Sequence, residues 1–217
     1  TGIGADNIDI VMNELDALVN IDLHTKEIKQ QKKSLNIVRI GTSGSVQADV
    51  PVHSFVISEM SLGIDGVLRF YKNNETVCDA DFEDAFIAAC HWTPRAARPY
   101  AVKASGELVN KLHTEGVTVK GVTLTANGFY GPQGRVLRLP IEMPTVNDEI
   151  ARFSFGNYKI VNYEMESAAI AGLAALMGHQ ATTICLIIAN RATGDASSNY
   201  KPYMKKLVEY TLNSLIR

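Results

Sequence analysis

The chain has 217 residues, of which 46% are hydrophobic and 20% charged, a composition that indicates a folded protein with a substantial core and favours one large domain over two small ones. The formal net charge is −2, so no overall positive field favours nucleic acid or an anionic membrane as a partner. No apolar run reaches the length of a membrane span. Three irregularly spaced cysteines do not suit a disulfide framework, so we expect a cytoplasmic protein.

The first half of the chain predicts a helix followed by strands. The predicted elements are a helix over 5–19, a solvated basic segment over 26–33, a buried strand over 36–40, a glycine-rich turn over 41–45 and a second strand over 53–60. The stretch 61–84 is weakly patterned and is predicted to be rich in loops, with Phe70 and Tyr71 as packing residues.

The second half alternates more regularly between helix and strand. The predicted elements are a helix over 100–115, a strand over 117–126, a flexible segment over 137–150, a short strand over 160–163, an apolar helix over 165–177, a central strand over 181–189 and an amphipathic helix over 200–216 whose Tyr203, Leu207 and Leu215 face inward. Strands that alternate with helices predict a layered α/β domain. The pattern leaves the strand order open.

A polar loop over 128–135 combines an aromatic ring, an amide and a guanidinium. Phe129 offers a face for stacking, Gln133 offers donors and an acceptor, and Arg135 offers a planar fork of donors. A pyrimidine such as uracil presents O2, N3–H and O4 along one edge, and an amide beside a guanidinium can satisfy all three. The alternative is an ordinary polar turn, which the glycines and the proline of this loop also indicate.

Arg39 stands near the end of a predicted buried strand, before the sequence Gly41-Thr42-Ser43-Gly44. The strand supplies a fixed cation, and the predicted turn supplies hydroxyl groups and free backbone N–H groups, which suit a phosphate. Open α/β sheets also bind ligands at the carboxyl ends of their strands. The alternative is a turn whose arginine is satisfied by carbonyl groups or a carboxylate.

Two carboxylates lie at a predicted strand-to-helix junction, in Tyr163-Glu164-Met165-Glu166-Ser167. Residues two apart on a helix do not face each other, so we expect a split role, with one carboxylate structural and one facing a ligand. A carboxylate can accept from two adjacent hydroxyl groups, as in a ribose diol. The alternative is acidity that complements the helix dipole.

Taken together, these motifs resemble those of the uridine phosphorylases in the nucleoside phosphorylase superfamily. The resemblance covers most of the chain and rests on Arg39-Ile40-Gly41-Thr42, Phe129-Tyr130 with Gln133 and Arg135, Asn162-Tyr163-Glu164-Met165-Glu166-Ser167, and Ile188-Ala189-Asn190-Arg191. It implies one domain over 1–217, built as a three-layer α/β/α fold with a central mixed, twisted sheet flanked by helices.

The resemblance assigns the base site to the polar loop. Gln133 and Arg135 would bind uracil, Phe129 would pack against the nucleoside, and Arg191 would help to close the pocket. Arg135 would stabilise the negative charge of the departing base.

The sugar and phosphate are assigned to the other two motifs. Glu166 would hold the ribose hydroxyl groups with Met165 packed beside the sugar, and Glu164 is a weaker candidate for the same site. Arg39 and Thr42 would bind phosphate, with Thr42 also reaching the ribose. The expected catalytic residues are Arg39, Arg135 and Glu166.

The implied activity is the reversible phosphorolysis of uridine to uracil and ribose 1-phosphate, a step of pyrimidine salvage. Inorganic phosphate would be the co-substrate, with no metal and no organic cofactor. Cys90 and His91 are adjacent, but no further Cys or His stands at ligand spacing. The alternatives are a purine nucleoside phosphorylase and a non-catalytic nucleoside-binding relative.

Two residues discriminate within the superfamily. The purine enzymes have an Asp where Asn190 stands here, and an amide cannot act as a general acid for a purine ring. The related nucleosidases lack the arginine before the Gly-Thr pair, so Arg39 favours phosphate over water as the nucleophile.

The resemblance also implies a segment ahead of Thr1. The family has a strand and a glycine loop there that complete the phosphate site, and a histidine that reaches the neighbouring subunit. We therefore expect that the full protein begins before Thr1, and that it is a homo-oligomer, either a dimer or a hexamer built as a trimer of dimers.

Overall fold

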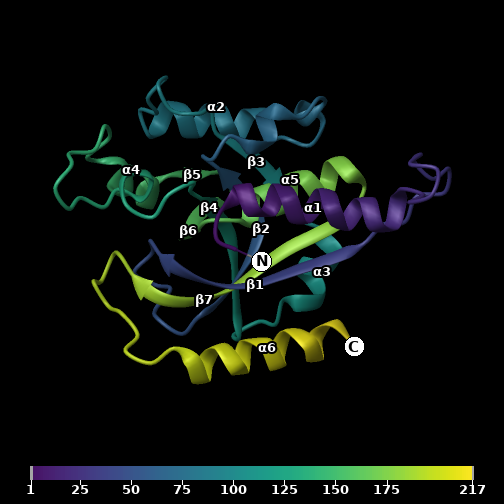
Figure 1. The fold of residues 1–217 in the computed structure, drawn as a ribbon. Helices are drawn as coiled ribbons and strands as arrows, with labels where there is room; N and C mark the ends of the chain where they lie inside the picture. The colour runs from purple at the N-terminus through teal and green to yellow at the C-terminus, as the bar shows by residue number, and fades with distance from the viewer. Residues whose placement is uncertain (1, 217) are drawn as a thin grey trace.

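The computed structural model describes residues 2–216, which form a seven-stranded mixed sheet with helices on both sides (Figure 1). The strands are β1 (Asn36–Ser45), β2 (Phe55–Gly63), β3 (Tyr100–Lys103), β4 (Thr118–Thr125), β5 (Ser154–Phe155), β6 (Tyr158–Glu164) and β7 (Gln180–Asn190). Their order is β1-β7-β2-β4-β6-β5, with β3 paired to β2. The predicted α/β class, with a central mixed sheet between helices, is confirmed.

The helices cover the sheet in separate groups (Figure 1). They are α1 (Ala5–Asn20), α2 (Ala80–Ala89), α3 (Gly106–Leu112), α4 (Val146–Arg152), α5 (Ser167–Met177) and α6 (Lys201–Leu215). Helices α1 and α5 share one apolar cluster, whereas α3 and α6 pack on β7 and β2 in another, which includes Leu207, Tyr203 and Leu215 as predicted. No helix within 2–216 is both long and apolar enough to cross a membrane.

The sheet curls until its two ends meet. Strand β1 runs parallel to β7, and its last residues also pair antiparallel with β6, where Gly44 lies opposite Tyr163 and Ser45 lies opposite Asn162. The path β1-β7-β2-β4-β6 therefore returns to β1. Because the motifs around Arg39 and Glu164 stand on these two strands, the closure brings them together.

The predicted glycine-rich turn over 41–45 is wrong, because these residues continue β1. The register against β7 shifts only between Ser43 and Gly44. A side chain at Gly41 would collide with the guanidinium of Arg39. The glycine therefore makes room for a neighbouring side chain within a strand, and does not mark a change of direction.

The predicted helix over 100–115 is wrong in its first third. Tyr100–Lys103 forms β3, which pairs with β2. The helix starts later, at Gly106, where the Ser105 side chain accepts from Leu108 N.

The stretch 61–84 holds more regular structure than predicted. It contains the end of β2, two short 3₁₀ turns, η1 (Val67–Phe70) and η2 (Asn74–Thr76), and the start of α2, which is capped by Asp79. Tyr71 packs beside the α1–α5 cluster as predicted, but Phe70 is 91% exposed and the prediction that it packs is wrong.

Candidate active site

The polar loop over 128–135 folds into a tight turn. Tyr130 O accepts from both Gln133 N and Arg135 N, at 3.0 and 2.9 Å, and a short 3₁₀ turn, η3 (Gly131–Gln133), lies between them. Gly134 follows with φ 69°, in the left-handed region that favours glycine. The turn thus points the side chains of Gln133 and Arg135 toward each other.

The amide of Gln133 lies between two guanidinium groups. Its Oε1 accepts from Arg135 Nη1 at 2.7 Å and from Arg191 Nη2 at 2.6 Å, and the side chain is buried. Because both partners can only donate, the atom between them is the oxygen. The Nε2 group is therefore the side of the amide that is left to donate to a ligand.

Phe129 and Arg135 form the outer part of this arrangement. The guanidinium of Arg135 lies 3.9 Å from the centroid of the Phe129 ring and donates to Phe129 O at 2.5 Å. Burial lowers the pKa of Arg135. The Phe129 ring is about half exposed, so it can cover a ligand that enters beside Arg135.

Arg191 contacts Gln133 on the side of the buried Tyr163 ring. Its guanidinium donates to Gln133 O at 2.7 Å and lies 4.6 Å from the centroid of the buried Tyr163 ring. Burial, and then the nearby charge of Arg135, lower the pKa of Arg191 to about 10. Within residues 2–216, neither Arg191 nor Arg135 forms an ion pair with a carboxylate. We call Phe129, Gln133, Arg135 and Arg191 the base end of the site.

At the other end, Glu164 holds the start of α5. Its carboxylate accepts from Glu166 N at 2.8 Å, from Ser167 N at 2.9 and 3.0 Å, and from Thr125 Oγ1 at 2.5 Å. Burial raises the pKa of Glu164, although Arg39 acts against this. Glu164 is thus held by protein donors, which suits the structural half of the split role.

Arg39 joins the two carboxylates. Its guanidinium pairs with Glu164 at 3.2 Å and with Glu166, and it also donates to Cys185 Sγ at 3.6 Å. Burial disfavours the charge, but the neighbouring Cys185, Glu164 and Glu166 outweigh it and raise the pKa of Arg39. Burial raises the pKa of Cys185 itself to about 12, so at neutral pH the two carboxylates supply the attraction.

Glu166 reaches beyond Arg39 to the first residues of the chain. Its Oε1 accepts from Gly4 N at 2.6 Å, and its side chain is 6% exposed. Met165 beside it is half-buried. We call Arg39, Glu164 and Glu166 the carboxylate end of the site.

Thr42 lies on β1 three residues after Arg39, and it is half-buried. The structure places Arg39 in the carboxylate end, and among residues 2–216 no side-chain hydrogen bond joins Thr42 to Arg39, Glu164 or Glu166.

Strand β1 connects the two ends. Gly41 lies under the guanidinium of Arg39, and the Cβ position of Gly44 would be 3.8 Å from Arg191 Nε. Three residues of strand span about 10 Å, which is on the scale of a nucleoside. The sequence predicted that Gly41 and Gly44 belong to a phosphate-binding turn, whereas in the structure they are strand residues beside the two guanidinium groups. No role was predicted for the Tyr163 ring, which lies against Arg191.

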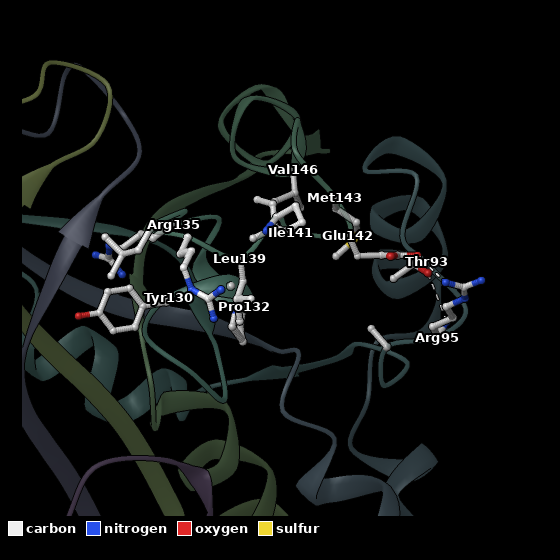
Figure 2. A pocket seen from close by; sticks show the side chains of 15 residues that line it. Thr93, Arg95, Tyr130, Pro132, Arg135, Leu139, Ile141, Glu142, Met143 and Val146 are labelled. Atoms are coloured by element: carbon white, nitrogen blue, oxygen red, sulfur yellow. Dashed lines mark hydrogen bonds and ion pairs between the residues drawn. The ribbon is translucent and has the colours of Figure 1, made fainter.

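A cavity of about 750 Å³ adjoins the base end (Figure 2). Tyr130 and Arg135 stand at one side of it, and the ion pair between Arg95 and Glu142 stands at the other. Its walls are mostly apolar and come from the segment 130–146, together with Thr93, Arg95 and Ala96. The segment that was predicted to be flexible therefore forms a wall of this cavity and continues into α4.

Comparisons with known proteins identify the family of the chain. The sequence profile described as the Phosphorylase superfamily matches residues 1–213. A uridine phosphorylase of Thermococcus kodakarensis is 23% identical over 201 residues, which are 90% of this chain and 58% of that protein. A DeoD-type purine nucleoside phosphorylase of Listeria welshimeri is 26% identical over 198 residues, which are 91% of this chain and 65% of that protein. The chain thus spans less than two thirds of the length of both relatives.

Solved structures show the same fold. The crystal structure of a Trypanosoma brucei nucleoside phosphorylase, described as showing uridine phosphorylase activity, superposes with a TM-score of 0.84 at 24% identity, over 100% of this chain and 78% of the other. A uridine phosphorylase of Schistosoma mansoni in complex with citrate gives a TM-score of 0.65 at 22% identity, over 100% of this chain and 68% of the other. With the profile match over nearly its whole length, the chain belongs to the phosphorylase superfamily.

Proposed function

We propose that the protein catalyses the reversible phosphorolysis of uridine to uracil and ribose 1-phosphate. The observation that carries this proposal is the Gln133 amide held between Arg135 and Arg191. Those two cations have no carboxylate partner among the residues described, so the base end carries an excess of positive charge. A uracil that leaves with the electrons of its glycosidic bond carries negative charge on O2 and O4. The positive charge of the base end would stabilise it.

The carboxylate end has the opposite excess, because two carboxylates share the guanidinium of Arg39. Glycosidic bonds break through a transition state in which the sugar becomes positively charged. In our proposal Glu166 holds the ribose hydroxyl groups, Met165 packs beside the sugar, and this negative charge stabilises the cationic sugar.

In the proposed reaction a phosphate oxygen attacks C1′ of the ribose while the bond from C1′ to N1 of uracil breaks. The bonding electron pair passes to the base, where Arg135 and the Nε2 group of Gln133 stabilise it and Phe129 stacks on the ring. Arg39 is the proposed phosphate ligand in this chain, with Thr42 as a second candidate. Inorganic phosphate is the only co-substrate proposed.

Phosphate must compete with Glu164 and Glu166 for Arg39. A dianion beside two carboxylates needs further cations, so we propose that residues of a neighbouring subunit contribute to the phosphate site. The proposed homo-oligomer and the cytoplasmic location both remain predictions.

A purine nucleoside phosphorylase is the second candidate, favoured by the Listeria welshimeri relative at 26% identity. The test is the phosphorolysis of uridine and of inosine at equal concentrations, measured by separating free bases. Our proposal predicts uracil release at a kcat/KM well above that for hypoxanthine release. Release of hypoxanthine alone would establish the purine activity, and tight uridine binding without turnover would leave a nucleoside-binding protein.

A further inference from the structure

Asn190 ends β7 directly before Arg191, and every hydrogen-bonding position of its amide is occupied by backbone. The Nδ2 group donates to Gln47 O and to Val50 O, both at 2.9 Å. The Oδ1 atom accepts from Ala192 N at 2.8 Å and from Thr193 N at 3.1 Å. The residue is 2% exposed, so its side chain is committed to the protein and has no remaining group for a ligand.

These bonds join two connecting segments. Gln47 and Val50 belong to the connection between β1 and β2, and Ala192 and Thr193 belong to the connection between β7 and α6. The backbone of Asn190 adds two more bonds to the second connection, from Asn190 N to Asp195 O at 2.8 Å and from Gly194 N to Asn190 O at 2.9 Å. The chain after Asn190 is thus wrapped around it.

Arg191 follows Asn190 directly, and so it starts the connection that the bonds of Asn190 hold in place. Its own N–H donates to Ser45 O at 2.9 Å, and its guanidinium reaches both Oε1 and O of Gln133. We propose that Asn190 is a positioning residue that aims Arg191 at Gln133, and that its bonding also bars a carboxylic acid from this position. The first part deepens the proposed function and rests on it where it concerns turnover.

The second part follows from the two carbonyl groups that face Nδ2. An aspartate has no donors when ionised, so at position 190 one of its oxygens would face Gln47 O and Val50 O at the distances that Nδ2 now occupies. The side chain of Asn190 is also enclosed by the backbone of the two connecting segments. In this chain, an acid at position 190 would therefore lose the anchor of Arg191 while its side chain stayed enclosed by backbone.

The test is a double-mutant cycle with Asn190→Asp, Arg191→Ala and the pair, using kcat and KM for uridine phosphorolysis by the full chain. Asn190→Ala is a second route to the same loss if the aspartate variant folds poorly. Asn199→Asp is the matched control, because it makes the same chemical change at an exposed residue of the same connection.

We expect Asn190→Asp to lower kcat/KM by about 10²-fold, the cost of misplacing a binding group by about 1 Å. The kcat/KM of the double variant should be little lower than that of Arg191→Ala alone, since Asn190 acts through Arg191. Asn199→Asp should stay within about twofold of wild type. Losses that multiply in the pair, a kcat/KM of Asn190→Asp within twofold of wild type, or new inosine cleavage by Asn190→Asp would each overturn the proposal.

The same cycle in urea unfolding separates this proposal from the proposed function. If the contacts of Arg191 depend on Asn190, the pair loses less unfolding free energy than the two single variants added together. A wild-type chain that cleaves no uridine would defeat the proposed function and leave this coupling measurable. Additive losses of unfolding free energy would defeat the positioning role whether or not the chain turns over uridine.

Discussion

The two ends of the site are built in opposite ways. At the carboxylate end, Arg39 and two nearly buried carboxylates lie on β1, at the end of β6 and at the start of α5, held by backbone donors. At the base end, Arg135 stands on a turn whose Phe129 and Tyr130 are each about half exposed, and its charge has no carboxylate partner among the residues described.

This difference means that the two ends contribute unequally to the stability of the fold. A buried guanidinium shared by two carboxylates supports the fold whether or not a ligand is present, because removing it leaves buried charge uncompensated. Two neighbouring guanidiniums without a counter-ion are costly, and they are useful only when an anion or a developing negative charge arrives. Changes at the carboxylate end should therefore lower the stability of the fold as well as turnover, whereas changes at the base end should act mainly on turnover.

The largest effect is expected for Arg39→Ala, which should lower the free energy of unfolding by about 3–5 kcal/mol because it leaves Glu164 and Glu166 uncompensated. Urea denaturation measures this loss. The charge-compensated variant Arg39→Ala with Glu166→Gln should recover part of it. A loss below about 1 kcal/mol, the usual range of an exposed pair, would contradict the account of this end.

Arg135→Ala should lower kcat by about 10²-fold, as the loss of one donor to a developing negative charge does. Its free energy of unfolding should change by less than about 1 kcal/mol, because Arg135 is only half-buried and Gln133 Oε1 keeps its bond to Arg191. Steady-state phosphorolysis of uridine and urea denaturation of one preparation give both values. Near-native turnover would remove Arg135 from the proposed catalytic residues.

Phe129→Ala should weaken uridine binding more than it slows turnover. The ring loses its contact with the Arg135 guanidinium, worth about 0.5–1 kcal/mol at an exposed site, and its stacking on the base, worth about 1–3 kcal/mol. KM should rise roughly tenfold, with kcat changing less, and Phe129→Tyr should stay close to wild type. A loss confined to kcat would show that the ring acts in some way other than by binding.

The smallest effect concerns Cys185, beneath Arg39, whose pKa burial raises from 9.0 to about 12. An acid with a raised folded pKa stabilises the fold fully below its unfolded pKa, and this stability is lost as the pH rises from 9.0 toward about 12. The free energy of unfolding should fall over that range, and Cys185→Ser should reduce the slope. An unchanged slope would indicate that Cys185 ionises in the folded protein as it does when unfolded.

Much of the fold follows from local pattern. Helical spacing predicted α1 and α6, and the apolar run of 181–189 predicted β7, because burial against one partner or on both faces leaves a clear periodicity. The errors lie where a longer-range contact decided the outcome. Gly41 indicated a turn, but it is a strand residue that makes room for Arg39, and β3 is a strand because β2 offers it an edge.

The site divides in the same manner. The residue types of the loop over 128–135 predicted that Phe129, Gln133 and Arg135 act together, and the structure brings them into contact; base binding by this loop stays a prediction. The hydrogen bond from Arg191 to Gln133 could not be predicted from the sequence. It depends on the pairing of β1 with β6, which no local sequence pattern indicates. The full bonding of Asn190 could not be predicted either, because Gln47 and Val50 are far from it in the sequence.

The most direct test of the proposed reaction is uracil release from uridine with and without phosphate, with the sugar product identified by phosphorus NMR. We expect release that requires phosphate and yields ribose 1-phosphate. Release of free ribose without phosphate would make the protein a hydrolase and would contradict the role proposed for Arg39.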